Sequence, residues 1–361
     1  MHPFRYCSPN DFRKMVEPQR YSDRSDLLRA QVSKSVNHFW DPFDERYINF
    51  SIPFDINKEL VIDAIQIDEL QTSVVTAKLS TEDQIKLGND IMHFYLSQLL
   101  HGEQAALIVS SNLSQTLLDP GIQEFAANQA TEEARHVSAF SKYISMRFGA
   151  PMPMVKPMQD FVCELLSFDS IDKKIAGMQL LIEGLAVGVF KIFGKYAVDP
   201  VLKRLFQLVL IDEAHHHQFG KAWAEYEVGD LDTSVRDELE DWTVKSFLGA
   251  IVHLMSPFEK AGIYKKYNLT AQEMQDSMTE KFTPEKSRQM FVNKETFLYF
   301  LMKSLSDSGV LTNRSSKALG FMVDFDELSA QPDDILDTWV PEDVMDELKR
   351  INQGRQILKL L

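Results

Sequence analysis

The chain has 361 residues, of which 44% are hydrophobic and 25% charged, and its formal net charge is −15. An acidic surface of this kind repels nucleic acid and anionic membranes, so we expect neither as a partner. The two cysteines, Cys7 and Cys163, are too few for a disulfide framework and lack metal-ligand spacing, which favours a reducing, cytoplasmic setting.

Three regions follow from the pattern of the chain. Residues 1–79 read as an irregular, proline- and aromatic-rich arm followed by helix, packed on a core. Residues 80–226 carry long stretches with apolar side chains at helical spacing. Residues 227–361 read as a helical extension with polar breaks, also packed on the core. No stretch is rich in strand signals, so the sequence predicts an all-α fold with additional N- and C-terminal helices around a central bundle.

Four long helices are expected in the central region. The first begins at a capping box in which Thr81 pairs with Gln84. Asp119-Pro120 starts the second and Asp199-Pro200 the fourth, because Asp is a favoured N-cap and Pro is tolerated at the first helical position. The third covers about residues 171–197 and contains the most apolar stretch of the chain. That stretch is too short to span a bilayer and has a glutamate at its middle, so we expect a buried core helix.

A repeat at an offset of 80 residues relates the two halves of the central region. Each half contains a Glu, then an Asp-Pro pair sixteen residues later, then a Glu-x-x-His motif fourteen residues after that Asp. The matched residues are Glu103 and Glu183, Glu133 and Glu213, and His136 and His216.

The spacing of the repeat places its carboxylates and imidazoles at one level. Sixteen residues span roughly 24 Å of helix and fourteen span roughly 21 Å, so the chain returns to the same height after each Asp-Pro turn. The Glu and His of a Glu-x-x-His pair lie on one helix face. Two such hairpins present the ligand set of a di-metal site inside a four-helix bundle. Glu183 is the strongest single indication, because an unliganded carboxylate in so apolar a helix would be costly.

An acid precedes each Glu of the two Glu-x-x-His motifs. A metal-bound His usually donates its other N–H to a carboxylate, so we expect Asp212 to orient His136 and Glu132 to orient His216 across the bundle. The alternative is that both acids are ordinary helix residues. The remaining histidines of the second motif, His215 and His217, lack an upstream Glu and are expected to point outward or to a pocket edge.

A substrate pocket is expected about one turn from the ligands. The residues predicted to line it are Leu107, Ser110, Phe140, Gly184 and Val187. Glycine inside a helix lowers the stability of that helix by about 1 kcal/mol relative to alanine. The presence of Gly184 and Gly188 in an expected helix therefore needs an explanation. Either the helix packs closely against a neighbour at these points, or the missing side chains leave a cavity beside the site.

The motifs EEARH at 132–136 and DEAHH at 212–216, each with its upstream Glu, resemble those of the ferritin-like di-iron-carboxylate superfamily. Within it the chain is most similar to ribonucleotide reductase small subunits, the related ligand-binding oxidases and bacterial multicomponent monooxygenase hydroxylases. The segment HFWDP at 38–42 is similar to the Trp-containing entry of reductase small subunits. The resemblance implies a ferritin-like fold and two iron ions, or one manganese and one iron.

The resemblance also assigns roles to the ligands. Glu133 and Glu213 would bridge or chelate both metals. One metal would be completed by Glu103 with His136, and the other by Glu183 with His216.

Some positions depart from the patterns of the subfamilies. Phe140 stands where reductase small subunits usually carry their radical Tyr, and the chain ends in INQGRQILKLL rather than in an acidic, aromatic docking tail. Val209 stands where arylamine N-oxygenases of the superfamily carry a third His. These departures disfavour a reductase subunit and a close kinship with the N-oxygenases.

The function expected from these observations is that of an O2-activating di-iron oxygenase (a monooxygenase) or oxidase acting on a small organic substrate, free or carrier-bound. Such an enzyme implies a ferredoxin or reductase as electron donor, and we expect a homodimer. Two alternatives are a radical-generating subunit and a metal-storage or peroxide-scavenging protein. Storage proteins are small, whereas more than half of this chain lies outside its central region.

Overall fold

The computed structural model describes residues 2–9, 11–167, 170–281, 283–293, 296–330 and 342–359. All regular structure within these residues is helical, which confirms the predicted all-α class. Extended pairing among them is confined to two isolated bridges, one between Tyr6 and Leu117 and one between Ile62 and Ala197.

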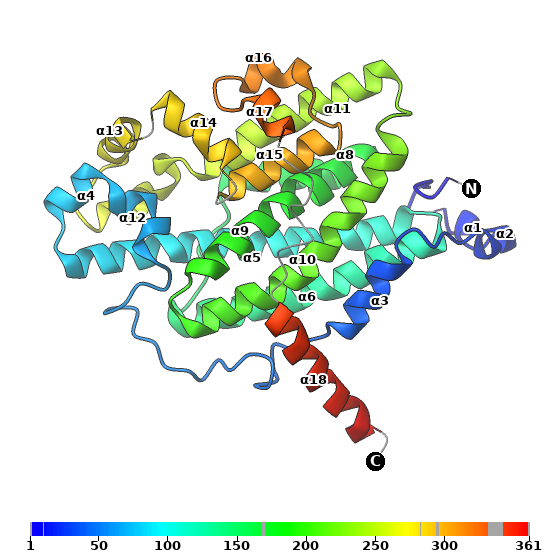
Figure 1. Cartoon of the computed structure of the whole chain (residues 1–361), viewed down its shortest axis with the longest axis horizontal. Coiled ribbons are helices and arrows are strands. Elements are labelled where there is room, and N and C mark those ends of the chain that lie inside the picture. The colour runs from blue at the N-terminus through cyan, green and yellow to red at the C-terminus, as the bar shows by residue number, and fades with distance from the viewer. Residues whose placement is uncertain are drawn as a thin grey trace.

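Four long helical segments occupy the centre of the molecule, in two antiparallel pairs (Figure 1). They are α5 (Thr81–Thr116), α6 (Pro120–Arg147), the run formed by α8 (Ile171–Ile175), η3 (Ala176–Ile182) and α9 (Glu183–Tyr196), and α10 (Pro200–Glu227). The first packs along the second, and α9 along α10. The ends of these helices lie within a few residues of the predicted ones. The two Asp-Pro pairs set the starts of α6 and α10 through contacts with the next few residues of the chain.

Both Asp-Pro pairs cap helices as predicted. Asp119 Oδ1 accepts hydrogen bonds from the backbone N–H groups of Gly121 at 2.8 Å and Ile122 at 3.0 Å. Asp199 Oδ1 accepts from the N–H of Val201 at 2.9 Å, and its other oxygen accepts from Tyr143 Oη at 2.9 Å. These bonds satisfy N–H groups that have no partner within the helix.

The start of α5 corrects the predicted capping box. The N-cap is Ser80, whose Oγ accepts from the N–H of Asp83 at 3.1 Å and donates to the Asp83 carboxylate at 2.8 Å. Thr81 is instead the first residue of the helix. Ser80 forms both of these hydrogen bonds with a single residue, Asp83. The predicted pair of Thr81 and Gln84 does not cap the helix in this way.

The N-terminal arm is less irregular than expected. It contains α1 (Phe12–Met15), α2 (Pro18–Ser22), α3 (Arg29–Asn37), η1 (Ala64–Gln66), η2 (Asp68–Gln71) and α4 (Ser73–Lys78). Of these, α3 lies against both α6 and α10. Its sequence, RAQVSKSVN, has too few apolar residues to give a helical pattern, so packing rather than periodicity supports it.

The C-terminal part is helical, and all of its described helices except the last lie along one side of the central helices, while that last helix lies on the other side (Figure 1). Its elements are α11 (Thr233–Ser246), η4 (Phe247–Val252), η5 (Pro257–Lys260), α12 (Ala261–Lys265), α13 (Ala271–Lys281), α14 (Pro284–Val292), α15 (Phe297–Asp307), η6 (Asn313–Ser315), α16 (Ser316–Leu319), α17 (Phe325–Ser329) and α18 (Glu342–Lys359). Of these elements, α15 lies directly against α9. The last helix, α18, contacts the N-terminal arm, where Tyr47 Oη donates a hydrogen bond to Asn352 Oδ1 at 2.6 Å.

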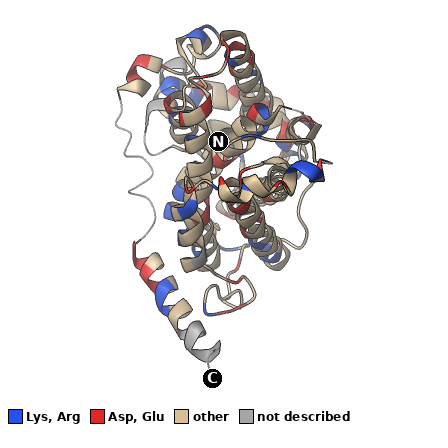
Figure 2. Ribbon diagram, turned by 90° about the vertical axis from the view of Figure 1, so that its right-hand side faces the viewer, with Lys and Arg blue, Asp and Glu red and all other residues tan. Residues whose placement is uncertain are grey.

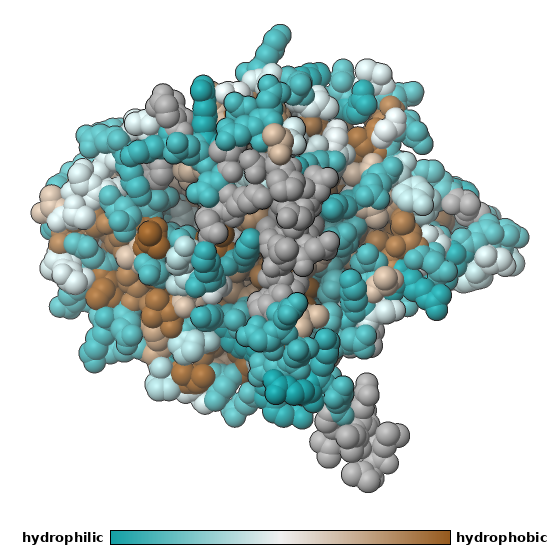
Figure 3. Space-filling model, in the orientation of Figure 1, coloured by the Kyte–Doolittle hydropathy of each residue, from teal (hydrophilic) through white to brown (hydrophobic). Residues whose placement is uncertain are grey.

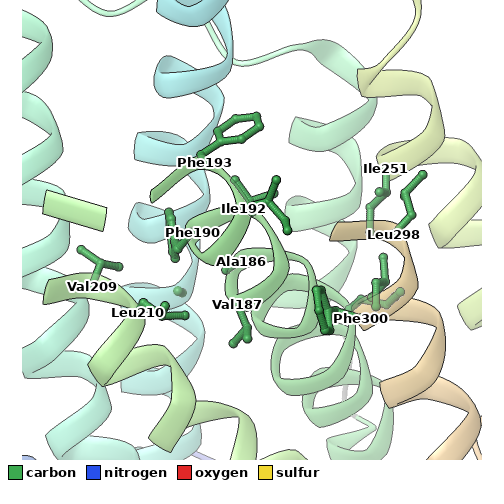
Figure 4. Packing of buried hydrophobic residues seen from close by; sticks show 14 of the residues in the cluster. Ala186, Val187, Phe190, Ile192, Phe193, Val209, Leu210, Ile251, Leu298 and Phe300 are labelled. Atoms are coloured by element: carbon green, nitrogen blue, oxygen red, sulfur yellow. The ribbon is translucent and has the colours of Figure 1, made fainter. Parts of the chain in front are cut away.

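The run Ile171–Tyr196 is long and apolar enough to cross a bilayer, but 89% of its apolar window is buried within the protein. Figure 4 shows Val187, Phe190 and Phe193 of α9 packed among apolar side chains of its neighbours. A buried core helix passes the same length and composition test as a membrane span.

Acidic and basic residues are interspersed along the helices (Figure 2). On the face drawn in Figure 3 hydrophilic residues predominate, and the apolar residues form separate, small patches.

Candidate metal centre

The six residues predicted as ligands lie together between the four central helices. They form two groups of four that could each hold a metal ion: Glu103, Glu133, His136 and Glu213 in one, and Glu133, Glu183, Glu213 and His216 in the other. Within each group one donor atom from every residue lies within 4.8 Å of the others. Two carboxylates, Glu133 and Glu213, belong to both groups.

The imidazole of His136 faces the first group with Nδ1. This nitrogen lies 3.1 Å from Glu103 Oε2, 3.1 Å from Glu133 Oε2 and 3.1 Å from Glu213 Oε1. Three carboxylates therefore surround one nitrogen on the side where an ion would sit, while Nε2 points away from them.

His216 repeats this arrangement in the second group. Its Nδ1 lies 3.0 Å from Glu133 Oε1, 3.1 Å from Glu213 Oε2 and 4.0 Å from Glu183 Oε2. Each shared glutamate thus offers one oxygen to each histidine. The planes of the two imidazole rings are inclined by 41°, and their centroids are 6.0 Å apart.

Burial and mutual repulsion dominate the electrostatics of the cluster. Glu103 is 5% exposed, Glu183 1%, and the other four side chains are still more enclosed. Burial raises the pKa of Glu103 and of Glu183 well above the usual value, and repulsion from Glu213 raises both further. Burial acts in the same direction on Glu133, but His216 and His136 outweigh it and hold the pKa of that carboxyl well below its usual range.

The donor set fits a pair of divalent cations. Four buried carboxylates without counter-ions would be strongly unfavourable, whereas two divalent ions would balance their charge. Oxygen and imidazole donors without thiolate suit iron, manganese or zinc more than copper(I).

Asp212 lies on the far side of His136, where the sequence analysis expected it. Its Oδ2 is 3.1 Å from His136 Nε2, and it accepts from Trp40 Nε1 at 2.7 Å and from Arg135 Nη2 at 3.1 Å. Burial raises the pKa of Asp212, but the charges of Arg135 and His136 outweigh it and the pKa lies below the usual value. Asp212 is therefore an anion that three donors hold in place.

Glu132 takes the corresponding place beside His216. Its Oε2 lies 2.8 Å from His216 Nε2, and its Oε1 accepts from Ser35 Oγ of α3. Ser35 in turn accepts from Asn128 Nδ2 at 2.6 Å. Each acid thus contacts the imidazole of the opposite hairpin, and the N-terminal arm supports both acids through Ser35 and Trp40.

One further residue of the site was not anticipated. Gln129 Nε2 donates to Glu183 Oε1 at 2.7 Å and lies 3.2 Å from Glu133 Oε1. Its own oxygen accepts from Gln179 Nε2 at 2.8 Å. The signal in the sequence is its place one helical turn before Glu133, on the same face of α6.

A π-helical segment, η3, ends directly before Glu183. A π-helix has a wider turn than an α-helix and occurs mostly as a short insertion, often at functional sites. The wider turn rotates the side chains of the residues that follow it around the helix axis. It therefore helps to set the direction in which the Glu183 side chain points. Hydrophobic periodicity gave no sign of this segment.

A cavity of about 390 Å³ lies on the side of α9 and α10 that faces α15. Of the predicted pocket residues, Gly184 and Val187 line it, and Leu107, Ser110 and Phe140 do not. Phe140 instead packs in the apolar core, with its ring centroid 5.8 Å from that of Phe190. Ser110 is fully buried on α5 and Leu107 is half-buried, and neither lines the cavity.

The two histidines beside His216 have different surroundings. His217 lies at the pocket edge as expected, and its Nε2 is 3.2 Å from Ser304 Oγ. His215 does not point outward: its ring stacks on that of His38 at 5.3 Å. Burial lowers the pKa of each to about 4, so both are neutral at physiological pH.

Two different structural reasons account for the presence of glycine at positions 188 and 184 of α9. A Cβ on Gly188 would lie 2.8 Å from the carbonyl oxygen of Phe297 and 2.9 Å from its Cα, because the backbone of α15 packs directly on this position. A Cβ on Gly184 would meet nothing closer than Leu301 Cδ1 at 3.4 Å, and this residue lines the cavity. Close packing explains the first glycine, and the cavity explains the second.

We therefore expect Gly188→Ala to destabilise the protein by about 1–3 kcal/mol, since neither backbone can yield without shifting a helix. Gly184→Ala should be neutral or stabilising by up to about 1 kcal/mol, because alanine favours the helix and finds room. Chemical denaturation of the two variants measures the difference. Equal effects would contradict the distinction between packing and cavity.

No protein-family model matches the chain, and no curated protein is detectably similar to it in sequence.

Proposed function

We propose that this protein is an O2-activating di-iron oxidoreductase of the ferritin-like di-iron-carboxylate superfamily, an oxygenase or oxidase for a small organic substrate. The observation that carries the proposal is the pair of buried four-donor groups that share Glu133 and Glu213. A structural role for four buried carboxylates would give no reason for two imidazoles to face them with the same nitrogen.

Two iron ions, or iron with manganese, would supply the electrons that reduce O2 when bound at this centre. The residues of the chain then have separate tasks. Glu133 and Glu213 would hold both ions, and Glu103 with His136 and Glu183 with His216 would complete one each. Asp212 and Glu132 orient the imidazoles through Nε2. The apolar helices around the cluster exclude water, which strengthens every charge interaction inside.

Turnover requires electrons from outside the chain. We infer an electron-donor protein of the ferredoxin or reductase kind, and O2 with a small organic molecule as the two substrates. A homodimer in the cytoplasm remains our expectation for the setting in which the enzyme works.

A radical-generating subunit is the second candidate, and one observation favours it. The indole of Trp40 is connected to His136 through Asp212 by contacts of 2.7 and 3.1 Å, which is a path for an electron to leave the site. Against it stands Phe140, a residue with no hydroxyl, at the position where such subunits usually carry their radical Tyr. Electron paramagnetic resonance of the oxidised protein distinguishes the two, because a stable protein radical is expected only in the radical-generating subunit.

The test of the proposal is a titration of the metal-free protein with ferrous ion, followed by exposure to O2. We expect binding to saturate near two ions per chain, and the loaded protein to consume O2 in a single turnover. A storage protein would continue to take up iron beyond that ratio. Glu124→Ala, an exposed acid on α6, serves as the control and should behave like the wild type. Uptake of less than about half an equivalent would refute the proposal.

A further inference from the structure

The cavity beside α9 is an elongated cleft between α10 and α15, here named the α10–α15 cleft. The lining residues on α10 run at helical spacing from His217 to Glu225, and those on α15 from Phe300 to Asp307. Eight residues of helix span roughly 12 Å. The cleft therefore extends from the level of the candidate metal centre towards the surface, and its volume of about 390 Å³ is within the range of small-molecule sites.

The inner end of the cleft is apolar and enclosed. Val187 is 2% and Phe300 4% exposed, and Gly184 leaves the space beside them open. Figure 4 shows Phe300 projecting from α15 into the space between that helix and α9, near Val187. Two lining residues, Gly184 and His217, are direct chain neighbours of the candidate ligands Glu183 and His216. Adjacent helical residues point about 100° apart, so this end lies at the level of the centre but on the side of α9 and α10 that faces α15, and none of the six candidate ligands lines it.

Positive charge gathers farther out. Three cations line the cleft, namely Lys221, Arg236 and Lys303, together with two acids, Glu225 and Asp307. Lys303 pairs with Asp307. Within the described part of the chain, neither Lys221 nor Arg236 forms an ion pair.

Asp307 offsets Lys303, and Glu225 lies one helical turn after Lys221 on α10, so the lining carries an excess of one positive charge in a chain whose net charge is −15. A cleft with low-dielectric walls focuses the field of such charges and attracts anions. Ammonium and guanidinium groups without a protein partner are the groups that recognise carboxylates. The ligand that suits both ends of the cleft is therefore anionic at one end and apolar at the other.

We propose that the α10–α15 cleft binds a small organic carboxylate, with the carboxylate between Lys221 and Arg236 and the apolar body against Gly184, Val187 and Phe300. The proposal rests on the proposed function and names the class of its substrate. Lys221 lies one helical turn, roughly 6 Å, outward from His217. A chain of about the length of hexanoate spans that distance, which places its far end at the level of the metal centre.

The test is calorimetric binding to the full-length, metal-free protein with three probes of equal length: hexanoate, hexanol and hexylamine. We expect hexanoate to bind at least about 10-fold more tightly than the other two, since a charged group without a partner gains the most from an opposite charge. The double variant Lys221→Met with Arg236→Met should lose about 10-fold in hexanoate affinity and bind hexanoate and hexanol alike. Lys203→Met, an exposed lysine on the same helix, is the matched control and should bind as the wild type does.

A second variant tests the inner end. Gly184→Leu places a side chain where the apolar body is expected, so hexanoate should lose more affinity than the shorter butyrate. The matched substitution Gly262→Leu, at an exposed glycine where an added Cβ would meet open space, should leave both affinities unchanged. Equal losses for the two acids would contradict the orientation proposed for the ligand.

Three results would overturn the proposal: no hexanoate binding at millimolar concentration, tighter binding of hexylamine or hexanol, or unchanged hexanoate binding in the double variant. Because the protein is tested without metal, these results are independent of the proposed function. A protein that binds two ions and consumes O2 but ignores hexanoate would refute the carboxylate site alone. A protein that binds hexanoate through Lys221 and Arg236 but holds no metal would refute the oxidoreductase.

Discussion

Glu213→Ala is expected to remove both metal ions from the protein, whereas Glu183→Ala should remove only one. Glu213 belongs to both four-donor groups, and Glu183 to the second group alone. Without Glu213 each group keeps only three donor residues. Glu133 is then the one carboxylate that both groups still share. Without Glu183 the first group, around His136, keeps all four of its donors.

Elemental analysis after loading with ferrous ion and removal of excess metal measures this difference. We expect about two ions per chain in the wild type, about one in Glu183→Ala and less than half of one in Glu213→Ala. Both substitutions remove a buried carboxylate, so the folded state of each variant must be checked by circular dichroism. An unchanged metal content in Glu213→Ala would refute the sharing of that residue, and an unchanged content in Glu183→Ala would refute the 80-residue repeat as a guide to the site.

The ligand cluster could be read from the sequence because its signal is local and occurs twice. Helical rise fixes the height of each Glu relative to its Asp-Pro turn, and the cap of Asp119 or Asp199 depends only on the next two or three residues. The positions of Asp212 and Glu132 follow from the same geometry, since each directly precedes a candidate ligand. Side chains set by helical rise and local caps are the part of a fold that a single sequence specifies best.

The surroundings of the cluster could not be read in this way. Trp40 contacts Asp212 across 172 positions of the chain, and Ser35 contacts Glu132 across 97. The side of α9 on which the cavity lies depends on α15, whose packing no local pattern reveals. Of the residues predicted to line a substrate pocket, Gly184 and Val187, which face α15, line the cavity, and those on α5 and α6 do not. The π-helical turn before Glu183 also arises from packing rather than from periodicity.

Asp212→Asn is expected to lower the affinity of the His136 group for metal about 10–100-fold, the range found when the partner of a ligating histidine is replaced. The substituted amide side chain would have nearly the same shape, and its carbonyl could still accept from Trp40, so the fold should be preserved. What is lost is the negative charge 3.1 Å from His136 Nε2, which makes the imidazole a stronger donor to a cation and fixes the proton on Nε2. The change also leaves Arg135 without one of its two carboxylate partners.

Competition with a chelator on the folded variant measures the effect, and the two sites should respond differently. Asp212 contacts His136 and not His216, so one ion should be lost at lower chelator concentration while the other is retained nearly as in the wild type. Glu132→Gln should give the converse result, because Glu132 contacts His216 through its Oε2 at 2.8 Å. Glu124→Gln, an exposed acid on the same helix as Glu132, controls for the loss of one negative charge. If both ions weaken equally in either variant, Asp212 and Glu132 act through the overall charge of the site, and the separate orientation of each histidine is wrong.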